Sequence, residues 1–142
     1  MNFRLLWDGA VLVKEPIGEA VSLPVPRTIL VVEDDVFVRL TIAQDLMDAG
    51  FHVIQAASGE EALQLLKTTV PVDLVSTDIH MPGNVDGIAL ARQARVLRPK
   101  AKIIFLSSAA HLGRSAGLAD LTLDKPHLSS ELVKDINRLL GL

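Results

Sequence analysis

The sequence predicts an α/β domain whose parallel sheet is covered by helices on both faces. From Arg27 onward, short apolar segments alternate with longer segments of helical period. The first apolar segment, Thr28–Val32, shows no apolar–polar alternation, as expected for a strand that is buried on both faces. Helical connections between successive strands make those strands parallel.

The first strand, Thr28–Val32, leads through an acidic cluster into a predicted helix. Apolar residues recur there at helical spacing, and Gly50 supplies the C-terminal stop; the residues are Val36, Leu40, Ala43 and Met47. His52–Ala56 is predicted to be the second strand.

The next helix begins with a capping box, Ser58-Gly59-Glu60-Glu61. In this motif the serine hydroxyl accepts a hydrogen bond from the amide of Glu61, whose side chain reaches back. The helix is expected to run to about Lys67. Val72–Thr77 is the third strand, and a turn at 81–84 leads to a helix that begins at Asp86.

The last part of the domain contains one weak connection. Lys102–Leu106 and Leu121–Leu123 are predicted to be the fourth and fifth strands, and Ser129 or Ser130 is predicted to cap a last helix. Between these two strands, Ala109–Asp120 contains two glycines and no sustained apolar period. Two glycines cost a short helix on the order of 2 kcal/mol relative to alanine, so we expect a loop or one or two helical turns there.

Length and composition exclude several classes of protein. A chain of 142 residues with 49% hydrophobic residues is expected to form one ordered domain. Its net charge of −3 gives no electrostatic basis for binding nucleic acid. It contains no cysteine, which excludes disulfides and thiolate metal sites and fits a reducing cytoplasm.

Residues 1–26 are predicted to be an N-terminal extension or linker, and 27–142 the domain. Charged residues interrupt the apolar positions of the extension, so it has neither the apolar stretch of about 7–15 residues of a signal peptide nor the roughly 20 of a membrane helix. No membrane contact is expected. An extra strand or a dimer contact remains open for this segment.

Four polar clusters lie at the carboxyl ends of predicted strands, three directly after the strand and the fourth one residue later. They are Glu33-Asp34-Asp35, Asp78, Ser107-Ser108 and Lys125-Pro126. Because the carboxyl ends of parallel strands lie at one edge of a sheet, these side chains are expected to meet in one acidic pocket. An isolated acidic triplet would more simply cap a helix, but a second acid at another strand end favours a shared site.

The chemistry of this pocket predicts a magnesium site and phosphoryl transfer. Facing carboxylates repel one another unless a cation lies between them, and Mg²⁺ prefers such oxygen ligands. Asp78 is the candidate nucleophile, since a carboxylate can form an aspartyl phosphate. Lys125 is held extended by the following proline, whose peptide bond can be cis, and its ammonium can neutralise phosphoryl oxygens. Ser107, or else Ser108, can donate a hydrogen bond to the same group.

From Arg27 to Leu142 the chain resembles the receiver domain of two-component response regulators. The residues that carry the resemblance are Ile29–Asp35, Val75–Pro82, Asp86-Gly87, Ser107 and Lys125-Pro126. The resemblance implies a flavodoxin-like (βα)5 fold, a three-layer sandwich around a five-stranded parallel sheet. It implies that Asp78 accepts a phosphoryl group from a sensor histidine kinase or a phosphotransfer protein.

The same resemblance implies roles for the other pocket residues. Asp34, Asp35 and Asp78 would bind Mg²⁺ together with the backbone carbonyl of His80. Ser107 and Lys125 would contact the phosphoryl group.

The chain departs from the family pattern at several positions. Thr122 stands where a switch aromatic is usual, and His127 follows Lys-Pro where an aromatic or apolar residue is common. The turn 82–87 is one residue longer than the common form, and the interval from Ser107 to Lys125 is shorter. These features are similar to an alphaproteobacterial subgroup of small receivers with a reduced fourth helix. Signalling is therefore expected to depend on Ala109–Asp120.

Two functions remain open at this stage. The first is a receiver whose output passes through a partner protein or a homodimer, without direct DNA binding, since no basic helix is present and the chain ends after the last predicted helix. The second is a pseudo-receiver that acts as an interaction domain without phosphorylation. A hydrolase is less favoured, because the acid it needs two residues after the nucleophile is replaced by His80.

Overall fold

The computed structural model describes residues 3–7, 9–10, 12–16 and 25–142. Near the N-terminus, β1 (Phe3–Trp7) pairs with β2 (Leu12–Pro16) in an antiparallel hairpin. The extra strand that the sequence left open is therefore one of a pair. The expected linker falls largely on residues 17–24, which lie outside the described residues.

The predicted five-stranded parallel sheet is confirmed. Its strands are β3 (Thr28–Val32), β4 (His52–Ala56), β5 (Leu74–Thr77), β6 (Lys102–Ser107) and β7 (Leu121–Asp124). They lie in the order β4-β3-β5-β6-β7, and each neighbouring pair is parallel. The strand order reverses beside β3, so the carboxyl ends of β3 and β5 flank the point where such sheets place their ligands.

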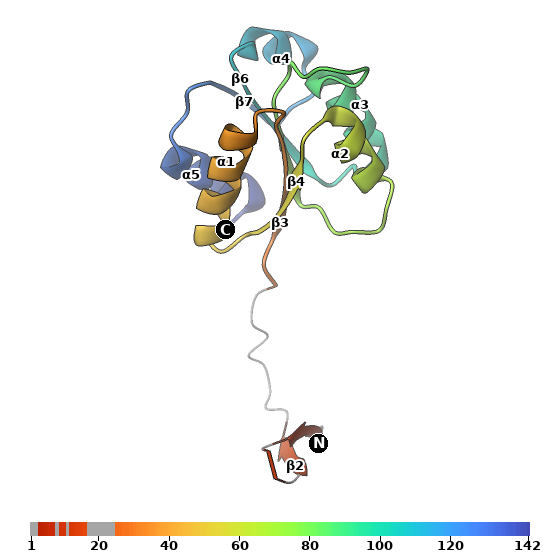
Figure 1. The fold of residues 1–142 in the computed structure, drawn as a ribbon, viewed down its shortest axis with the longest axis vertical. Helices are drawn as coiled ribbons and strands as arrows, with labels where there is room; N and C mark the ends of the chain where they lie inside the picture. The colour runs from red at the N-terminus through yellow and green to blue at the C-terminus, as the bar shows by residue number, and fades with distance from the viewer. Residues whose placement is uncertain (1–2, 8, 11, 17–24) are drawn as a thin grey trace.

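Helices cover both faces of this sheet, which makes the predicted three-layer sandwich (Figure 1). On one face lie α1 (Val36–Asp48) and α5 (Ser129–Leu140), and on the other lie α2 (Gly59–Leu66) and α3 (Gly87–Leu97). The connection between β6 and β7 forms only α4, Ala110–Ala116, a helix of seven residues. The expectation of one or two helical turns is confirmed.

The core is divided by the sheet into two apolar layers, because side chains alternate along each strand. Leu30, Val75 and Phe105 point to the layer under α2 and α3, and Ile29, Leu74 and Ile104 to the layer under α1 and α5. All six are fully buried. Each such side chain stabilises the fold by about 1.5–3 kcal/mol, so the sheet edge is a rigid platform.

The predicted cap of the last helix was wrong, and the apolar spacing of α1 does not mark its buried face. Val36, Leu40 and Met47 of α1 are exposed, and the buried residues of that helix are Ala43 and Leu46. Helix α1 is apolar on more than one face, so its period alone does not identify the face that meets the sheet. Neither serine caps α5: its N-cap is Leu128, without a side-chain hydrogen bond.

In the described part of the chain, no helix is both long enough and apolar enough to cross a membrane.

Candidate functional site

The candidate site is built by hydrogen bonds that continue the strand pairing past the strand ends. The backbone N–H of Asp78 donates to the Val32 carbonyl at 3.1 Å, which brings the residue after β5 beside the end of β3. The Lys125 N–H donates to the Ser107 carbonyl at 3.2 Å in the same way. Residues that are far apart in sequence are therefore held at one edge of the sheet, as the sequence predicted.

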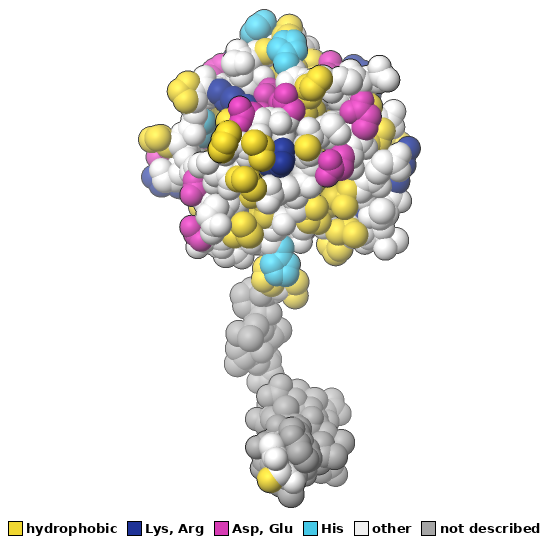
Figure 2. All heavy atoms as spheres, in the orientation of Figure 1, with side chains coloured by type: hydrophobic (Ala, Val, Ile, Leu, Met, Phe, Trp, Pro, Cys, Tyr) yellow, Lys and Arg dark blue, Asp and Glu magenta, His cyan; other side chains and the backbone are white. Residues whose placement is uncertain are grey.

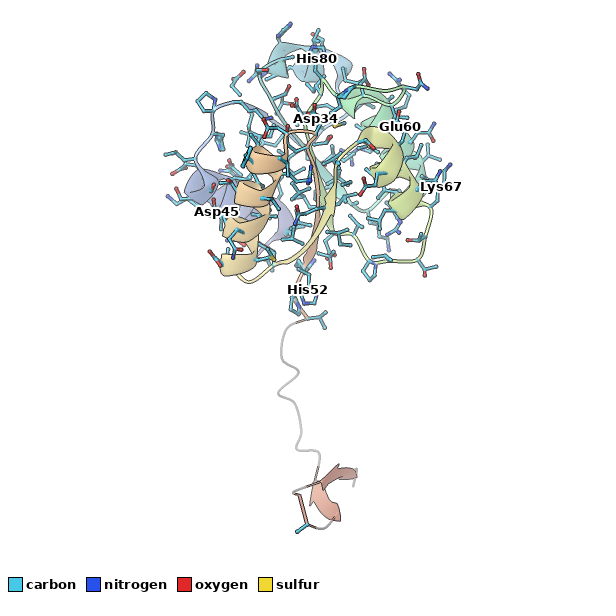
Figure 3. All side chains as sticks on the ribbon, viewed as in Figure 1. Asp34, Asp45, His52, Glu60, Lys67 and His80 are labelled. Carbon is cyan, nitrogen blue, oxygen red and sulfur yellow. The ribbon has the colours of Figure 1, made fainter. Side chains whose placement is uncertain are left out.

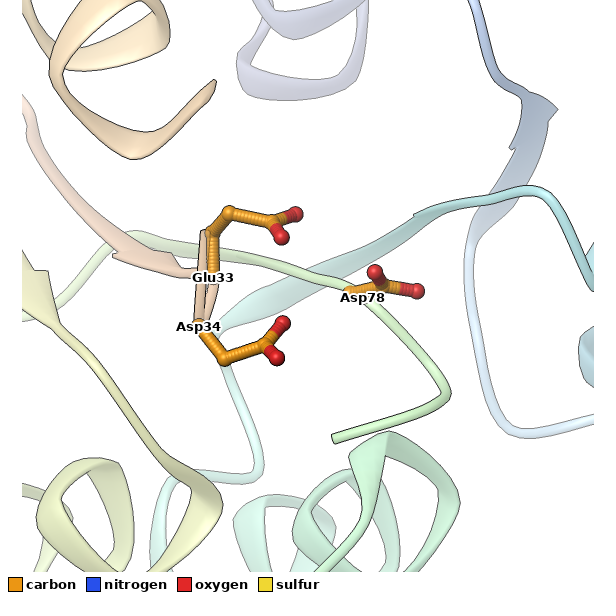
Figure 4. A group of neighbouring side chains, drawn as sticks. All are labelled: Glu33, Asp34 and Asp78. Atoms are coloured by element: carbon orange, nitrogen blue, oxygen red, sulfur yellow. The ribbon is translucent and has the colours of Figure 1, made fainter. Parts of the chain in front are cut away.

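Three carboxyl groups gather at this edge: Glu33 and Asp34 after β3, and Asp78 after β5 (Figure 4). Carboxylate oxygens from all three lie within 4.8 Å of one another. Glu33 is buried, Asp78 is half-buried and Asp34 is exposed. The cluster thus opens to solvent on the side of Asp34 and is closed at its base by Glu33.

Lys125 neutralises part of this charge. Its Nζ donates to Glu33 Oε2 at 2.5 Å and to Asp78 Oδ2 at 3.1 Å. Burial by itself lowers the pKa of Lys125, but the hydrogen bonds from its ammonium to Glu33 and Asp78 outweigh burial and leave the pKa above the ordinary 10.5. The ammonium therefore stays charged at neutral pH. The Lys125–Pro126 peptide bond is cis, as the sequence allowed.

Glu33 shows the cost of gathering acids in a buried place. Burial raises its pKa above the ordinary 4.5, and the nearby Asp78 raises it further. The hydrogen bond from Lys125 lowers the pKa but offsets only part of this rise. Ion pairing alone would lower the pKa of Glu33; burial decides the direction because only 4% of its side chain is exposed. The cluster therefore favours any additional positive charge.

Asp35, one of the expected metal ligands, does not join the cluster. Its carboxylate caps α1, with Oδ1 accepting from the N–H groups of Phe37 at 2.9 Å and Val38 at 3.1 Å. The member of the cluster that the expected ligand set did not include is Glu33, which continues β3 through a hydrogen bond from its N–H to the Ala56 carbonyl at 3.1 Å. The signal was present in the sequence, because an aspartate directly before a helical period is the usual N-cap.

The other predicted residues lie at the same edge of the sheet. Ser107 is the last residue of β6 and is fully buried, with its Oγ accepting from the Ala109 N–H at 3.1 Å. His80 is exposed, and it lies at the same end of the domain as Asp34 (Figure 3). On the face drawn in Figure 2, acidic and hydrophobic side chains lie next to one another near this end.

The donor set fits a hard divalent cation. Carboxylate oxygens are the ligands that Mg²⁺ prefers, and it keeps several waters, which suits a cluster that is open on one side. Glu33, Asp34 and Asp78 are the side chains that could hold it.

Comparisons with known proteins give one consistent result. Residues 29–137 match the family described as the response regulator receiver domain. The response regulator receiver protein CpdR of Brucella abortus (strain 2308) is 35% identical over 118 residues, which cover 80% of this chain and 97% of that protein. The sensor kinase CckA of the same strain is 34% identical over 139 residues, which cover 94% of this chain but only 15% of that longer protein.

A solved structure adds a similarity in three dimensions. The response regulator protein TrrA of Thermotoga maritima, in complex with Mg²⁺ and BeF, superposes with a TM-score of 0.72 at 33% identity. The match covers 80% of this chain and 98% of that one. The chain therefore has the flavodoxin-like fold that the resemblance implied.

Proposed function

This chain belongs to the response regulator receiver family, and we propose that Asp78 is its phosphoacceptor in a Mg²⁺-dependent transfer from a phosphohistidine. The observation that carries this proposal is the contact of Lys125 with both Glu33 and Asp78 inside the acidic cluster. A carboxylate held beside an ammonium and two further acids suits the capture of a dianionic group.

The transfer exchanges one bond for another. A carboxylate oxygen of Asp78 attacks phosphorus, the O–P bond forms, and the N–P bond of the phosphohistidine breaks. The leaving imidazole nitrogen takes a proton from solvent. Lys125 exchanges its contact with Asp78 for one with a phosphoryl oxygen, and the Ser107 hydroxyl donates to another. A Mg²⁺ ion held by Glu33, Asp34, Asp78 and the His80 carbonyl would neutralise charge on the phosphoryl oxygens when bound.

The donor protein is proposed to dock on α1. Phe37 is 80% exposed in the first turn of this helix, and Val36 and Leu40 are also exposed. These three side chains form the apolar face of α1, and a cavity of about 480 Å³ lies between this helix and the start of α5, lined by Phe37 and Lys125 among others. An apolar face directly beside the acidic cluster suits a partner that must present a phosphohistidine there. The sensor histidine kinase or phosphotransfer protein expected from the sequence would be this partner.

Incubation with a small phosphodonor such as phosphoramidate tests the phosphoacceptor role. The wild type with Mg²⁺ should gain one phosphoryl group by intact mass, while Asp78→Ala and the wild type in EDTA should gain none. A wild type that stays unmodified would favour the second candidate, a pseudo-receiver that acts through binding alone; the Thr122 position, which lacks an aromatic, keeps that candidate in view.

Docking on α1 is tested separately. Phe37→Ala should slow transfer from an autophosphorylated histidine kinase and leave labelling by phosphoramidate unchanged. Equal slowing with both donors would place the fault in the pocket rather than in docking. Four expectations from the sequence stay predictions. They are output through a downstream protein or a homodimer, the dependence of signalling on residues 109–120, the domain boundary at residue 27 and the cytoplasmic location.

A further inference from the structure

The loop between Asp78 and α3 is fixed at both of its ends. At its start, the Ile79 N–H donates to Asp78 Oδ1 at 2.6 Å. At its end, the Gly87 N–H donates to the Ile79 carbonyl at 2.8 Å, and Asp86 caps α3 by accepting from the Ala89 N–H at 2.8 Å. The close approach requires a glycine at 87, because a Cβ there would lie 1.9 Å from the Asp78 carbonyl oxygen. The middle of the loop includes His80, which is exposed, and Met81, whose side chain is buried in the core.

A polar support of the same loop comes from Glu60 in the first turn of α2. Its Oε1 accepts from the N–H of Asn84 at 2.6 Å and from the N–H of Val85 at 3.0 Å. Glu60 lies 24 and 25 positions before these residues, so the contact joins two separate segments of the chain. Figure 3 shows Glu60 at the same end of the domain as Asp34 and His80.

The backbone around this contact is shaped to permit it. Gly83 has a φ of 103°, and a Cβ on it would lie 2.6 Å from Glu60 Oε1. Gly59 packs against the loop so closely that a Cβ would lie 2.0 Å from the Val85 carbonyl oxygen. The start of α2 and the loop are therefore in direct contact: Gly83 makes room for the Glu60 carboxylate, and Gly59 makes room for the Val85 backbone.

The contact is also a strong one for its kind. Hydrogen bonds from its own backbone N–H and from those of Asn84 and Val85 lower the pKa of Glu60, so the side chain is ionised at neutral pH. Hydrogen bonds to an ionised acceptor are roughly twice as strong as those between neutral groups. The two N–H groups of this longer turn would otherwise face solvent.

We propose that Glu60 is a positioning residue of the phosphoryl-transfer site, which holds the loop 79–86 and thereby sets the affinity of the acidic cluster for Mg²⁺. Glu60 touches neither the carboxylates nor the reacting atoms; it acts through the backbone between Gly83 and Val85, three residues beyond His80. The inference rests on the proposed function, since it assumes that the loop supplies the His80 carbonyl to the metal.

Three variants separate positioning from general stability. Glu60→Ala removes the acceptor, and Glu60→Gln keeps an oxygen that can accept from both N–H groups. Glu61→Ala is the matched control: it removes a carboxylate from the same turn of α2, where Glu61 Oε2 accepts from the Ala57 N–H at 3.3 Å, without touching the loop.

Three measurements are made on each variant, the first without metal. Amide hydrogen exchange of the metal-free protein should show faster exchange at Asn84 and Val85 in Glu60→Ala only. Calorimetric titration with Mg²⁺ should then show an affinity about tenfold weaker in Glu60→Ala, the lower end of what removing an outer partner of a metal ligand costs. Labelling by phosphoramidate should recover to the wild-type rate at saturating Mg²⁺. Glu60→Gln should lie close to the wild type in all three.

The outcomes are distinct. Faster exchange in Glu60→Ala with unchanged Mg²⁺ affinity would overturn the positioning role, and so would an equal loss of affinity in Glu61→Ala. A wild type that binds no Mg²⁺ and accepts no phosphoryl group would instead contradict the proposed function, whereas the exchange measurement still reports whether Glu60 holds the loop.

Discussion

Carboxylates lie at both edges of the parallel sheet, but the fold neutralises them at one edge and not at the other. At the amino edge, Asp73 Oδ2 accepts from the N–H of Thr28 at 2.7 Å and Asp120 Oδ2 accepts from the N–H of Ile103 at 2.8 Å. Each of these acids therefore ties a loop to the start of a strand. Arg95 also donates to Asp120 Oδ2 at 2.8 Å.

Each of the three nitrogens of the Arg95 guanidinium donates one hydrogen bond at that edge. Besides Asp120 it donates to the carbonyls of Leu118 at 2.9 Å and Ala101 at 3.2 Å. Burial raises the pKa of Asp120, but the hydrogen bonds from the Ile103 N–H and Arg95 outweigh burial and leave the pKa below the ordinary 3.8. Glu33 at the carboxyl edge has its pKa moved the opposite way.

This difference shows what distinguishes a structural acid from a ligand-binding one. Asp120 accepts from a backbone N–H and from one guanidinium N–H of Arg95, so its charge is stabilised within the fold. Glu33, Asp34 and Asp78 share one ammonium among three carboxylates in the described structure. The fold leaves negative charge at the carboxyl edge uncompensated, and that charge is available to a cation.

The largest effect is expected from Asp34→Asn at the carboxyl edge. Removing one of three proposed ligands should weaken Mg²⁺ binding by at least about tenfold and slow labelling by phosphoramidate accordingly. The unfolding free energy of the metal-free protein should stay the same or rise by up to about 1 kcal/mol, because repulsion within the cluster is relieved. Titration calorimetry and urea unfolding measure the two quantities. If Asp34→Asn were less stable and bound Mg²⁺ with unchanged affinity, Asp34 would be a structural acid rather than a ligand-binding one.

Asp120→Ala should show the converse pattern at the amino edge. The Ile103 N–H, whose residue is only 1% exposed, loses its acceptor, so the unfolding free energy should fall by about 1–3 kcal/mol. Mg²⁺ affinity should not change. Asp120→Asn is the control, since an amide oxygen can still accept from Ile103 and only the charge is lost. A change in Mg²⁺ affinity without a loss of stability would remove the distinction between the edges.

At acid pH, Asp120 at the amino edge and Glu33 at the carboxyl edge should change the unfolding free energy in opposite directions. Asp120 has a lowered folded pKa, so its contribution to stability is present above about pH 3.8 and is lost as the pH falls through that folded pKa. Glu33 has a raised folded pKa, so the folded protein binds this proton first and gains stability as the pH falls through that pKa toward 4.5.

Urea unfolding of metal-free protein between pH 7 and 3 reads both contributions. As the pH falls toward 4.5, the unfolding free energy of the wild type should rise relative to that of Glu33→Gln. Below pH 3.8, the unfolding free energy of the wild type should fall relative to that of Asp120→Asn. Both differences should be smaller than the loss in Asp120→Ala. Contributions of the same sign would mean that burial does not govern Glu33.

Most of the fold was accessible from the sequence because its signals are local. Four of the five sheet strands begin at the predicted residue, namely Thr28, His52, Lys102 and Leu121, and β5 begins at Leu74, two residues later than predicted. The cap of α2 follows from Ser58, which accepts from the Glu61 N–H at 3.1 Å. The short α4 follows from two glycines. Each of these depends on neighbours in the chain rather than on tertiary contacts.

The errors in the sequence reasoning lie where tertiary contacts decide. Asp35 carries a local capping signal, but the direction of the chain leaving β3 decides that Glu33 joins Asp34 and Asp78 in the cluster. The buried face of α1 depends on which of its apolar sides meets α5 and the sheet. The Glu60 contact joins positions 24 and 25 residues apart, and no local pattern encodes it.

The smallest effect is expected from Arg114→Ala, which tests whether an ion pair matters without burial. Arg114 NH2 lies 2.9 Å from Asp124 Oδ2, next to Lys125, but the two side chains are 52% and 68% exposed. Solvent screens such a pair, so the unfolding free energy should change by no more than about 0.5 kcal/mol. A loss above 1 kcal/mol, measured by urea unfolding, would show that α4 is held by charge. The close packing of α4 against the sheet argues that apolar contacts hold it, because a Cβ on Gly113 would lie 2.6 Å from the Phe105 ring. Gly113→Ala should therefore destabilise the domain more than Arg114→Ala does.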